Sequence, residues 1–204
     1  MTDAAAATVR AYDRDAADYA ARGPALPASV RADIEELLAL VGAGARVLEI
    51  GSGGGRDAAF EELGLRVRRT DITPAFVALL REQGHAADVL DPLTDDLTST
   101  DGPYDAVYAN ASLLHVARTD LPTVLARLSG VTRPRGLLRL AVKEGDGDGW
   151  STHGSIRSPR HFTYWRADAL GAVVADAGWV DVAVTHVPGG TPAEQWLDVT
   201  AVSA

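Results

Sequence analysis

The sequence predicts a single α/β domain, on three observations. At 204 residues the chain is long enough for one well-buried core and too short for two ordinary domains with a linker. Its 47% hydrophobic and 23% charged residues are typical of a globular protein. Short apolar runs alternate with segments in which apolar residues recur at helical spacing. We therefore expect one domain over residues 1–204.

Apolar or alternating runs mark the predicted strands. They lie at 46–50, 66–70, 104–109, 136–142, 179–186 and 195–202, and a short third strand precedes Asp88. Alternation of strands with helices favours a parallel sheet covered on both faces. The last two runs are joined by the turn-rich segment PGGTPAE, which suits an antiparallel pair at the sheet edge. The predicted architecture is a Rossmann-like, doubly wound sheet of seven strands, mostly parallel with an antiparallel last strand.

Helices are predicted from apolar spacing and from residues that start or stop helices. Two N-terminal helices, at 5–22 and 27–41, precede the sheet, with Pro27 in a first turn. Another helix is expected to begin near Arg56, and Gly178 is expected to end the last one. The other predicted helices have apolar faces at Phe76, Val77 and Leu80, at Leu121, Val124, Leu125 and Leu128, and at Leu170, Val173, Val174 and Ala177.

Composition excludes several classes of function. A formal net charge of −9 at pH 7 repels a phosphate backbone, so we expect no nucleic-acid partner. With no cysteine, the chain forms no disulfide and no cysteine-ligated metal site. The N-terminus MTDAAAATVRAYDRD lacks a basic region followed by an apolar core, and no run of about 18 apolar residues occurs. We expect a cytoplasmic protein without a membrane partner.

A glycine-rich turn is the strongest local motif. The segment from Val47 to Asp57, VLEIGSGGGRD, reads as a buried strand followed by a turn in which Gly51 and Gly53 let the backbone touch a ligand. Asp71 ends the next predicted strand, about 20 residues further on, where an acid meets ribose hydroxyls in nucleotide-binding α/β folds. The sequence therefore predicts a nucleoside-containing cofactor at the carboxyl ends of the strands.

The glycine spacing distinguishes between two classes of cofactor. In a dinucleotide site the turn receives a pyrophosphate, but here Arg56 replaces the third glycine of that motif. Glu49, before the turn, favours a cationic ligand such as a sulfonium over an anionic one. Two alternatives stay open: Glu49 pairs with Arg46 or Arg56 beside a tight turn, or the chain is an NAD(P)-dependent oxidoreductase.

The segment EIGSGGG at 49–55, Asp71 and the strand YDAVYAN at 104–110 together resemble class I S-adenosylmethionine-dependent methyltransferases, over about residues 10–204. The resemblance implies S-adenosylmethionine as cofactor and S-adenosylhomocysteine as product. It implies that Gly51 and Gly53 approach the methionine and ribose parts, that Asp71 holds the ribose, and that Asp88 accepts from the adenine amino group. The other implied cofactor contacts are Tyr12, Tyr19, Glu49, Ile72, Val89 and Asn110.

Several implied roles have structural alternatives. Residues 1–42 are expected to form a helical lid that carries Tyr12 and Tyr19, although tyrosines on amphipathic helices often only pack. Asp88 also suits a helix or turn cap, and Asn110 a turn.

Residues 143–165 are expected to form the substrate side of the site. Glycines alternate with acids at 145–149, which suits a flexible loop that covers the substrate, although a plain solvated loop is the alternative. Three residues there, Arg157, Arg160 and Trp165, are the candidate substrate contacts, and the arginines favour a carboxylate or phenolate. The candidate general bases are His115, Lys143, His153 and Tyr164. We expect no metal site, because calcium and zinc ligand patterns are incomplete.

The resulting functional prediction is methyl transfer from S-adenosylmethionine to a small-molecule acceptor, at oxygen or nitrogen in preference to carbon. The alternatives are an NAD(P)-dependent oxidoreductase and a non-catalytic protein that binds S-adenosylmethionine. We expect a monomer or a homodimer.

Overall fold

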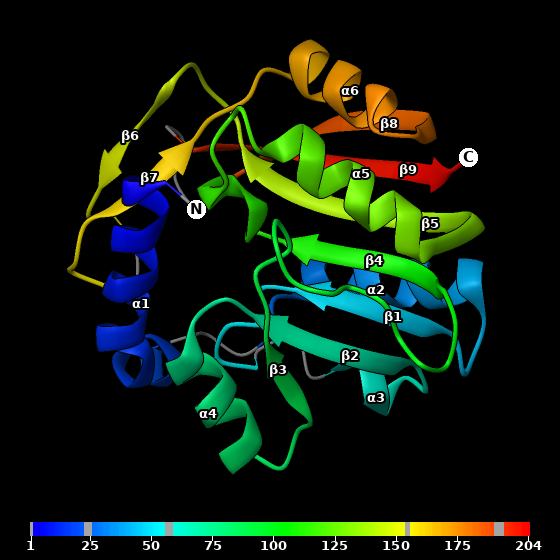
Figure 1. Ribbon diagram of the computed structural model, residues 1–204, viewed down its shortest axis with the longest axis horizontal. Coiled ribbons are helices and arrows are strands. Elements are labelled where there is room, and N and C mark those ends of the chain that lie inside the picture. The colour runs from blue at the N-terminus through cyan, green and yellow to red at the C-terminus, as the bar shows by residue number, and fades with distance from the viewer. Residues whose placement is uncertain (1, 23–25, 56–58, 154–155, 190–193) are drawn as a thin grey trace.

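The computed structural model describes residues 2–22, 26–55, 59–153, 156–189 and 194–204. One seven-stranded sheet, in the order β3-β2-β1-β4-β5-β9-β8, crosses the molecule (Figure 1). Its strands are β1 (Arg46–Ile50), β2 (Arg66–Asp71), β3 (Ala87–Val89), β4 (Tyr104–Asn110), β5 (Thr132–Lys143), β8 (Trp179–Pro188) and β9 (Gln195–Ser203). The pairs among β1 to β5 are parallel, whereas β9 is antiparallel to both β5 and β8. The predicted sheet is confirmed.

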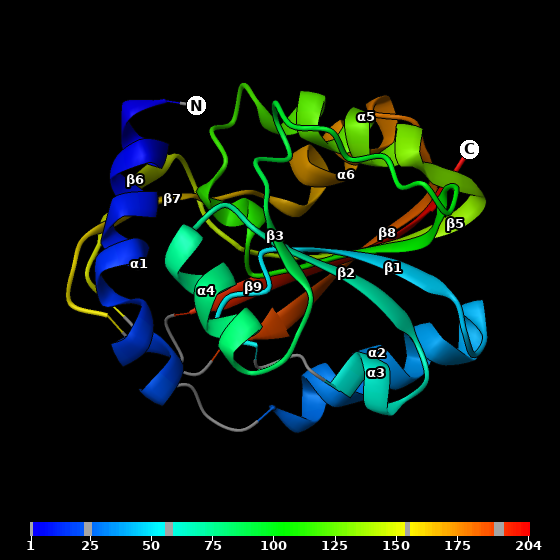
Figure 2. The ribbon, with the colours of Figure 1, turned by 60° about the horizontal axis from the view of Figure 1, so that its bottom comes forward.

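Helices cover both faces of this sheet (Figure 2). One side carries α2 (Ala28–Val41) and α3 (Ala59–Glu62), and the other carries α5 (Leu121–Val131) and α6 (Ala167–Asp176). The apolar faces of α2 and α5 are buried against the sheet, as Ile34 and Leu125 illustrate, and the face of α5 is the predicted one. The remaining helices are α1 (Asp3–Arg22), α4 (Pro74–Glu82) and the short 3-10 helix η1 (Leu113–His115).

The N-terminal helix α1 lies across the end of the sheet at which the parallel strands finish (Figure 1). Of the predicted lid at residues 1–42, only α1 takes this position, because α2 buries Ile34 and Leu37 on a face of the sheet. Pro27 precedes α2 as its N-cap residue and is not in its first turn. The predicted helix start near Arg56 lies outside the described residues.

The segment at 143–165 is more ordered than the sequence predicted. Among its described residues, β6 (Asp148–Ser151) and β7 (Arg160–Thr163) pair as antiparallel strands, so the expectation of a loop was wrong for this part. In β7, Arg160 and Phe162 are buried, while His161 between them remains partly exposed. Such alternation is the pattern of a half-buried strand.

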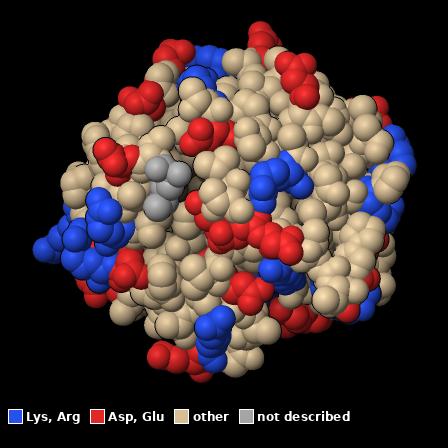
Figure 3. Space-filling view, viewed as in Figure 1, with Lys and Arg blue, Asp and Glu red and all other residues tan. Residues whose placement is uncertain are grey.

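The surface carries mixed charge. On the face shown in Figure 3, acidic and basic side chains are interspersed. None of the described helices has the length and apolar character needed to cross a membrane.

Candidate active site

A cavity of about 150 Å³ lies under α1, at the carboxyl ends of the parallel strands. We call one end of it the glycine-loop end, formed by Tyr19, Gly51, Gly53, Asp71 and Ile72. The hairpin end, next to β7, is formed by Ala5, Thr8, Val9, Tyr12 and His115, and it meets the glycine-loop end where the ring centroids of Tyr12 and Tyr19 lie 5.7 Å apart. The structure therefore brings together seven of the residues that the sequence selected, namely Tyr12, Tyr19, Gly51, Gly53, Asp71, Ile72 and His115.

The glycine turn touches the loop that follows β4. Gly51 has φ +81°, and a Cβ added there would lie 2.2 Å from the Cβ of Ser112. The amide nitrogens of Gly51 and Ser52 both donate to the carbonyl oxygen of Thr70, at 2.8 and 2.9 Å. A glycine is thus required at position 51 both by the backbone conformation and by the close approach.

Asp71 presents a rigid carboxylate to the cavity. Its side chain is only 6% exposed, and Oδ2 and Oδ1 accept hydrogen bonds from the amides of Gly53 and Thr73, at 2.9 and 2.8 Å. Burial raises the pKa of this carboxyl group above its ordinary value. Each carboxylate oxygen has a second lone pair, which leaves Asp71 able to accept two donors from a ligand.

Glu49 lies behind the glycine turn and is absent from the cavity wall. Its side chain is 2% exposed, and Oε2 accepts from Ser52 Oγ at 2.6 Å and from Arg69 Nη1 at 2.9 Å. Among the described arginines, Arg69 binds Glu49, whereas Arg46 binds backbone oxygens near the start of β4. Arg56 is outside the described residues. The strand β2, RVRRTD, carries three arginines, so its sequence gave no signal that Arg69 would be the buried partner.

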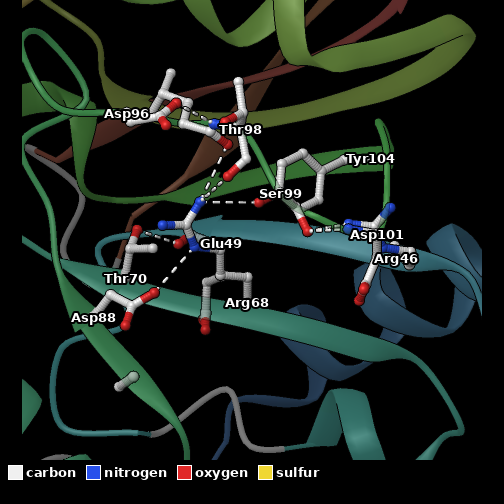
Figure 4. Close-up of polar contacts among 12 residues, drawn as sticks. Arg46, Glu49, Arg68, Thr70, Asp88, Asp96, Thr98, Ser99, Asp101 and Tyr104 are labelled. Carbon is white, nitrogen blue, oxygen red and sulfur yellow. Dashed lines mark hydrogen bonds and ion pairs between the residues drawn. The ribbon is translucent and has the colours of Figure 1, made fainter.

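Asp88 lies within β3 and faces away from the cavity. Its Oδ2 accepts from Arg68 Nε at 3.1 Å, and its side chain is 52% exposed (Figure 4). Val89 is also exposed. The cavity wall is instead formed by the next four residues, 90–93, which sequence reasoning missed because they form no recognisable motif.

Asn110 ends β4, as predicted, but its side chain contributes to a separate small cavity with Asp33 and Asp198. The following residue, Ala111, has φ +54° and turns the chain toward the main cavity, whose wall it joins. Ser112, next to it, carries a buried hydroxyl without a hydrogen-bond partner among the described residues.

His115, at the hairpin end, has both ring nitrogens engaged. Nε2 lies 3.0 Å from the Tyr12 hydroxyl, and Nδ1 lies 2.7 Å from the carbonyl oxygen of His161. Burial lowers the pKa of His115 to about 4, and the nearby charges of Arg160 and Lys143 act in the same direction. The imidazole is therefore neutral at pH 7, and a ring that resists protonation this strongly is a weak general base.

Arg160 supports this pair from behind. It is 4% exposed, its Nη1 donates to the Tyr12 hydroxyl at 3.3 Å, and its guanidinium lies over the rings of Tyr12 and Phe162. Its Nη2 also donates to the carbonyl oxygen of His153. Arg160 thus contacts the cavity only through Tyr12.

The other predicted substrate-side residues lie away from the cavity wall. Lys143 pairs with Glu194, at 2.6 Å between Nζ and Oε1. The side chains of His153 and Arg157 are exposed, Tyr164 stacks on Phe162, and Trp165 is buried in the core under a cation–π contact with Arg118. His153 and Arg157 lie in the connection between β6 and β7, a pairing that the sequence did not predict.

Comparison with known proteins adds independent information. A family model described as a methyltransferase domain matches residues 48–140, from β1 to β5. Curated protein sequences give no match. A structure of the Burkholderia thailandensis 1,6-didemethyltoxoflavin N1-methyltransferase, bound to 1,6-didemethyltoxoflavin and S-adenosylhomocysteine, is similar with a TM-score of 0.68 and 26% identity. The match covers 87% of this chain and 79% of that one.

Two further methyltransferase structures share the fold along nearly their whole length. The magnesium protoporphyrin IX methyltransferase of Synechocystis, with bound S-adenosylmethionine, has a TM-score of 0.75 at 15% identity, over 100% of this chain and 99% of that one. A methyltransferase of Streptomyces caelestis has a TM-score of 0.71 at 17% identity, over 97% and 99%. These findings set aside the oxidoreductase and the non-catalytic alternatives. Residues 48–140 form a methyltransferase domain, and the enzyme uses S-adenosylmethionine as the methyl donor and releases S-adenosylhomocysteine.

Proposed function

We propose that this enzyme methylates an oxygen or nitrogen atom of a small-molecule acceptor. The observation that carries the proposal is the cavity itself, which is roofed by α1 of the same chain and bounded at one end by the glycine turn and Asp71. A site closed by the chain's own helix suits a small molecule better than a polymer. The similar Burkholderia and Synechocystis enzymes act on a small heterocycle and a porphyrin, which supports a small-molecule acceptor for this enzyme.

The glycine-loop end fits S-adenosylmethionine. Gly51 and Gly53 let the backbone approach the ligand, and Asp71 offers acceptor lone pairs to ribose hydroxyls. The unpartnered hydroxyl of Ser112 offers one more polar contact. Among the described residues no lysine or arginine lines the cavity, which suits a cofactor that carries a sulfonium and no phosphate.

The other implied cofactor contacts differ in the role that we propose for them. Tyr19 and Ile72 line the same end of the cavity and are proposed to pack on the cofactor. Glu49 is proposed to act indirectly, because its hydrogen bond from Ser52 fixes the glycine turn. Asp88 is not proposed as the residue that accepts from the adenine amino group, because its carboxylate already accepts from Arg68.

The residues of this chain mainly bind, orient and exclude water. When bound, S-adenosylmethionine supplies an electrophilic methyl group, so little further chemistry is needed from the protein. The helix α1 covers the cavity and shields the reacting groups, while the two tyrosines and Asp71 fix what lies beneath it. Residues 1–204 are proposed to form one domain, with α1 as its lid.

The direct test combines binding and turnover. S-adenosylhomocysteine should bind with micromolar affinity and raise the melting temperature, and NADH should do neither. Formation of S-adenosylhomocysteine should then be measured across a panel of hydroxyl, amine and carbon acceptors of similar size. Turnover limited to carbon acceptors would contradict the proposed chemistry, and binding of NADH without S-adenosylhomocysteine would contradict the cofactor.

A further inference from the structure

The hairpin end of the cavity has a fixed hydrogen-bond polarity. Four groups form one chain of hydrogen bonds there: the guanidinium of Arg160, the hydroxyl of Tyr12, the ring of His115 and the carbonyl of His161. They come from α1, η1 and β7, so the chain exists only when these three elements pack together.

The direction of each hydrogen bond follows from the carbonyl. A carbonyl oxygen only accepts, so Nδ1 of His115, at 2.7 Å from the His161 oxygen, carries the ring proton. Burial keeps the pKa of His115 near 4, so Nε2 has no proton at neutral pH. Nε2 must then accept, and the hydroxyl of Tyr12, at 3.0 Å, must donate to it.

Tyr12 has one proton, and that proton is committed to His115. Arg160 Nη1 donates to the same hydroxyl oxygen and takes up one of its two lone pairs. One lone pair remains for a ligand. Tyr12 Oη can therefore accept a hydrogen bond from a bound molecule but cannot donate one.

The ionisable side chains that line the cavity are also hydrogen-bond acceptors. Asp71, Asp91 and Asp120 line the same cavity as further acceptors, and the charge of Asp71 acts on Tyr12. Positive charge stays behind the wall, since Arg160 is covered by Tyr12 and Lys143 is paired with Glu194. The remaining groups that face the His115 pair are Tyr19 and His161, and His161 is itself paired with Asp148. An anionic ligand would therefore meet carboxylates and no cationic side chain among the described residues.

We propose that the methyl acceptor is a neutral or cationic molecule that presents an N–H or O–H donor to Tyr12 Oη, such as an alcohol, a phenol or an amine, and not a carboxylate. This inference rests on the proposed function and adds the substrate class. It replaces the anionic substrate, a carboxylate or phenolate, that Arg157 and Arg160 suggested in the sequence. Tyr12 also contacts the ring of Tyr19, with 5.7 Å between the ring centroids, and Tyr19 lies against Gly53, so the donor would lie beside the cofactor.

The inference can be tested before any natural acceptor is known. Phenol, anisole and benzoate have the same ring, but only phenol is a neutral donor, anisole only accepts, and benzoate is an anion. Their binding to protein saturated with S-adenosylhomocysteine should be measured by ligand-observed NMR titration. Phenol should bind about 5-fold more tightly than anisole, the effect of one net hydrogen bond, and benzoate should bind most weakly.

Three variants locate the effect. Tyr12→Phe should reduce the ratio of phenol to anisole affinity to about 1, because the acceptor oxygen is gone. His115→Phe should release the proton of Tyr12 and raise the affinity for anisole relative to phenol. The control Tyr164→Phe removes a hydroxyl outside the cavity wall and should leave the ratio unchanged.

Equal binding of phenol and anisole to the wild-type protein, or tightest binding of benzoate, would overturn the inference. A preference for phenol seen only without S-adenosylhomocysteine would assign Tyr12 to the cofactor and would also overturn it. The two proposals fail separately. Failure to bind S-adenosylhomocysteine contradicts the proposed function. Binding of S-adenosylhomocysteine without a preference for phenol contradicts only the inference that the acceptor donates a hydrogen bond to Tyr12 Oη.

Discussion

The two ends of the cavity differ in what holds their functional groups in place. At the glycine-loop end, Asp71 accepts hydrogen bonds from the amides of Gly53 and Thr73, so backbone groups of neighbouring strand ends fix the carboxylate. At the hairpin end, Tyr12 and His115 fix each other through side chains from positions far apart in the chain. The first arrangement depends on the sheet, and the second depends on the docking of α1.

This difference predicts how each end responds to substitution. Backbone contacts at the strand ends leave little freedom, so changes at the glycine-loop end should have large effects on cofactor binding. The hairpin end can repack around a lost side chain, so changes there should alter ligand preference and pH dependence more than cofactor affinity.

The largest expected effect is that of Gly51→Ala. Its Cβ would overlap Ser112, so affinity for S-adenosylhomocysteine should fall by more than about 100-fold as the turn shifts. The matched control is Gly44→Ala, since Gly44 has a similar φ of +77° but no atom within 4 Å of the added Cβ. Thermal unfolding should show about 1 kcal/mol of destabilisation for the control and more for Gly51→Ala. Equal losses in both variants would mean that only the backbone conformation matters.

Next in size is Asp71→Ala. Loss of two charged hydrogen bonds to the ribose should weaken binding of S-adenosylhomocysteine by about 1.5 to 3 kcal/mol, measured by calorimetric titration. Stability should change little, because relief of the buried carboxylate offsets the two lost backbone contacts. The control Asp96→Ala removes an exposed aspartate that also accepts from a backbone amide, that of Thr98, at 2.8 Å. Unchanged affinity in folded Asp71→Ala protein would place the ribose elsewhere.

A smaller effect concerns pH. The pKa of His115 is about 4 in the folded protein against an ordinary value of 6.5, so the unfolded chain takes up this proton first as the pH falls. The stabilisation from His115 is complete above pH 6.5 and is lost as the pH falls toward 4. Between pH 7 and pH 5.5 the loss should be about 1 kcal/mol in urea unfolding.

His115→Phe should remove this part of the pH dependence. The exposed His153 provides the control, because His153→Gln should leave the slope of stability against pH unchanged. Identical slopes in the wild-type protein and in His115→Phe would show that His115 is not held neutral by burial.

The smallest expected effects are those of Arg157→Ala and Tyr164→Phe. Neither side chain lines the cavity, so affinity for S-adenosylhomocysteine should stay within about 2-fold of wild type, and binding of phenol likewise. A loss of more than about 10-fold in cofactor affinity would show that the β6–β7 hairpin reaches the glycine-loop end, and would remove the distinction between the two ends.

The sequence by itself determined the sheet, the glycine turn and the place of Asp71. These features depend on apolar periodicity, on turn residues and on the rule that parallel strands end at one edge, all of which act over short stretches of chain. Arg46–Ile50, for example, is a strand with the bounds that its apolar run predicted.

Only the tertiary structure decided which polar side chains face the cavity. The carboxylate of Glu49 pairs with Arg69, and the carboxylate of Asp88 pairs with Arg68. A buried or half-buried carboxylate needs a cationic partner, and the fold decides which cation is in reach. The β6–β7 pairing directed Arg160 onto Tyr12 and left Arg157 in solvent. Periodicity and motifs carry no information about such contacts, since they join residues on different elements, 20 positions apart for Glu49 and Arg69 and 103 for Tyr12 and His115.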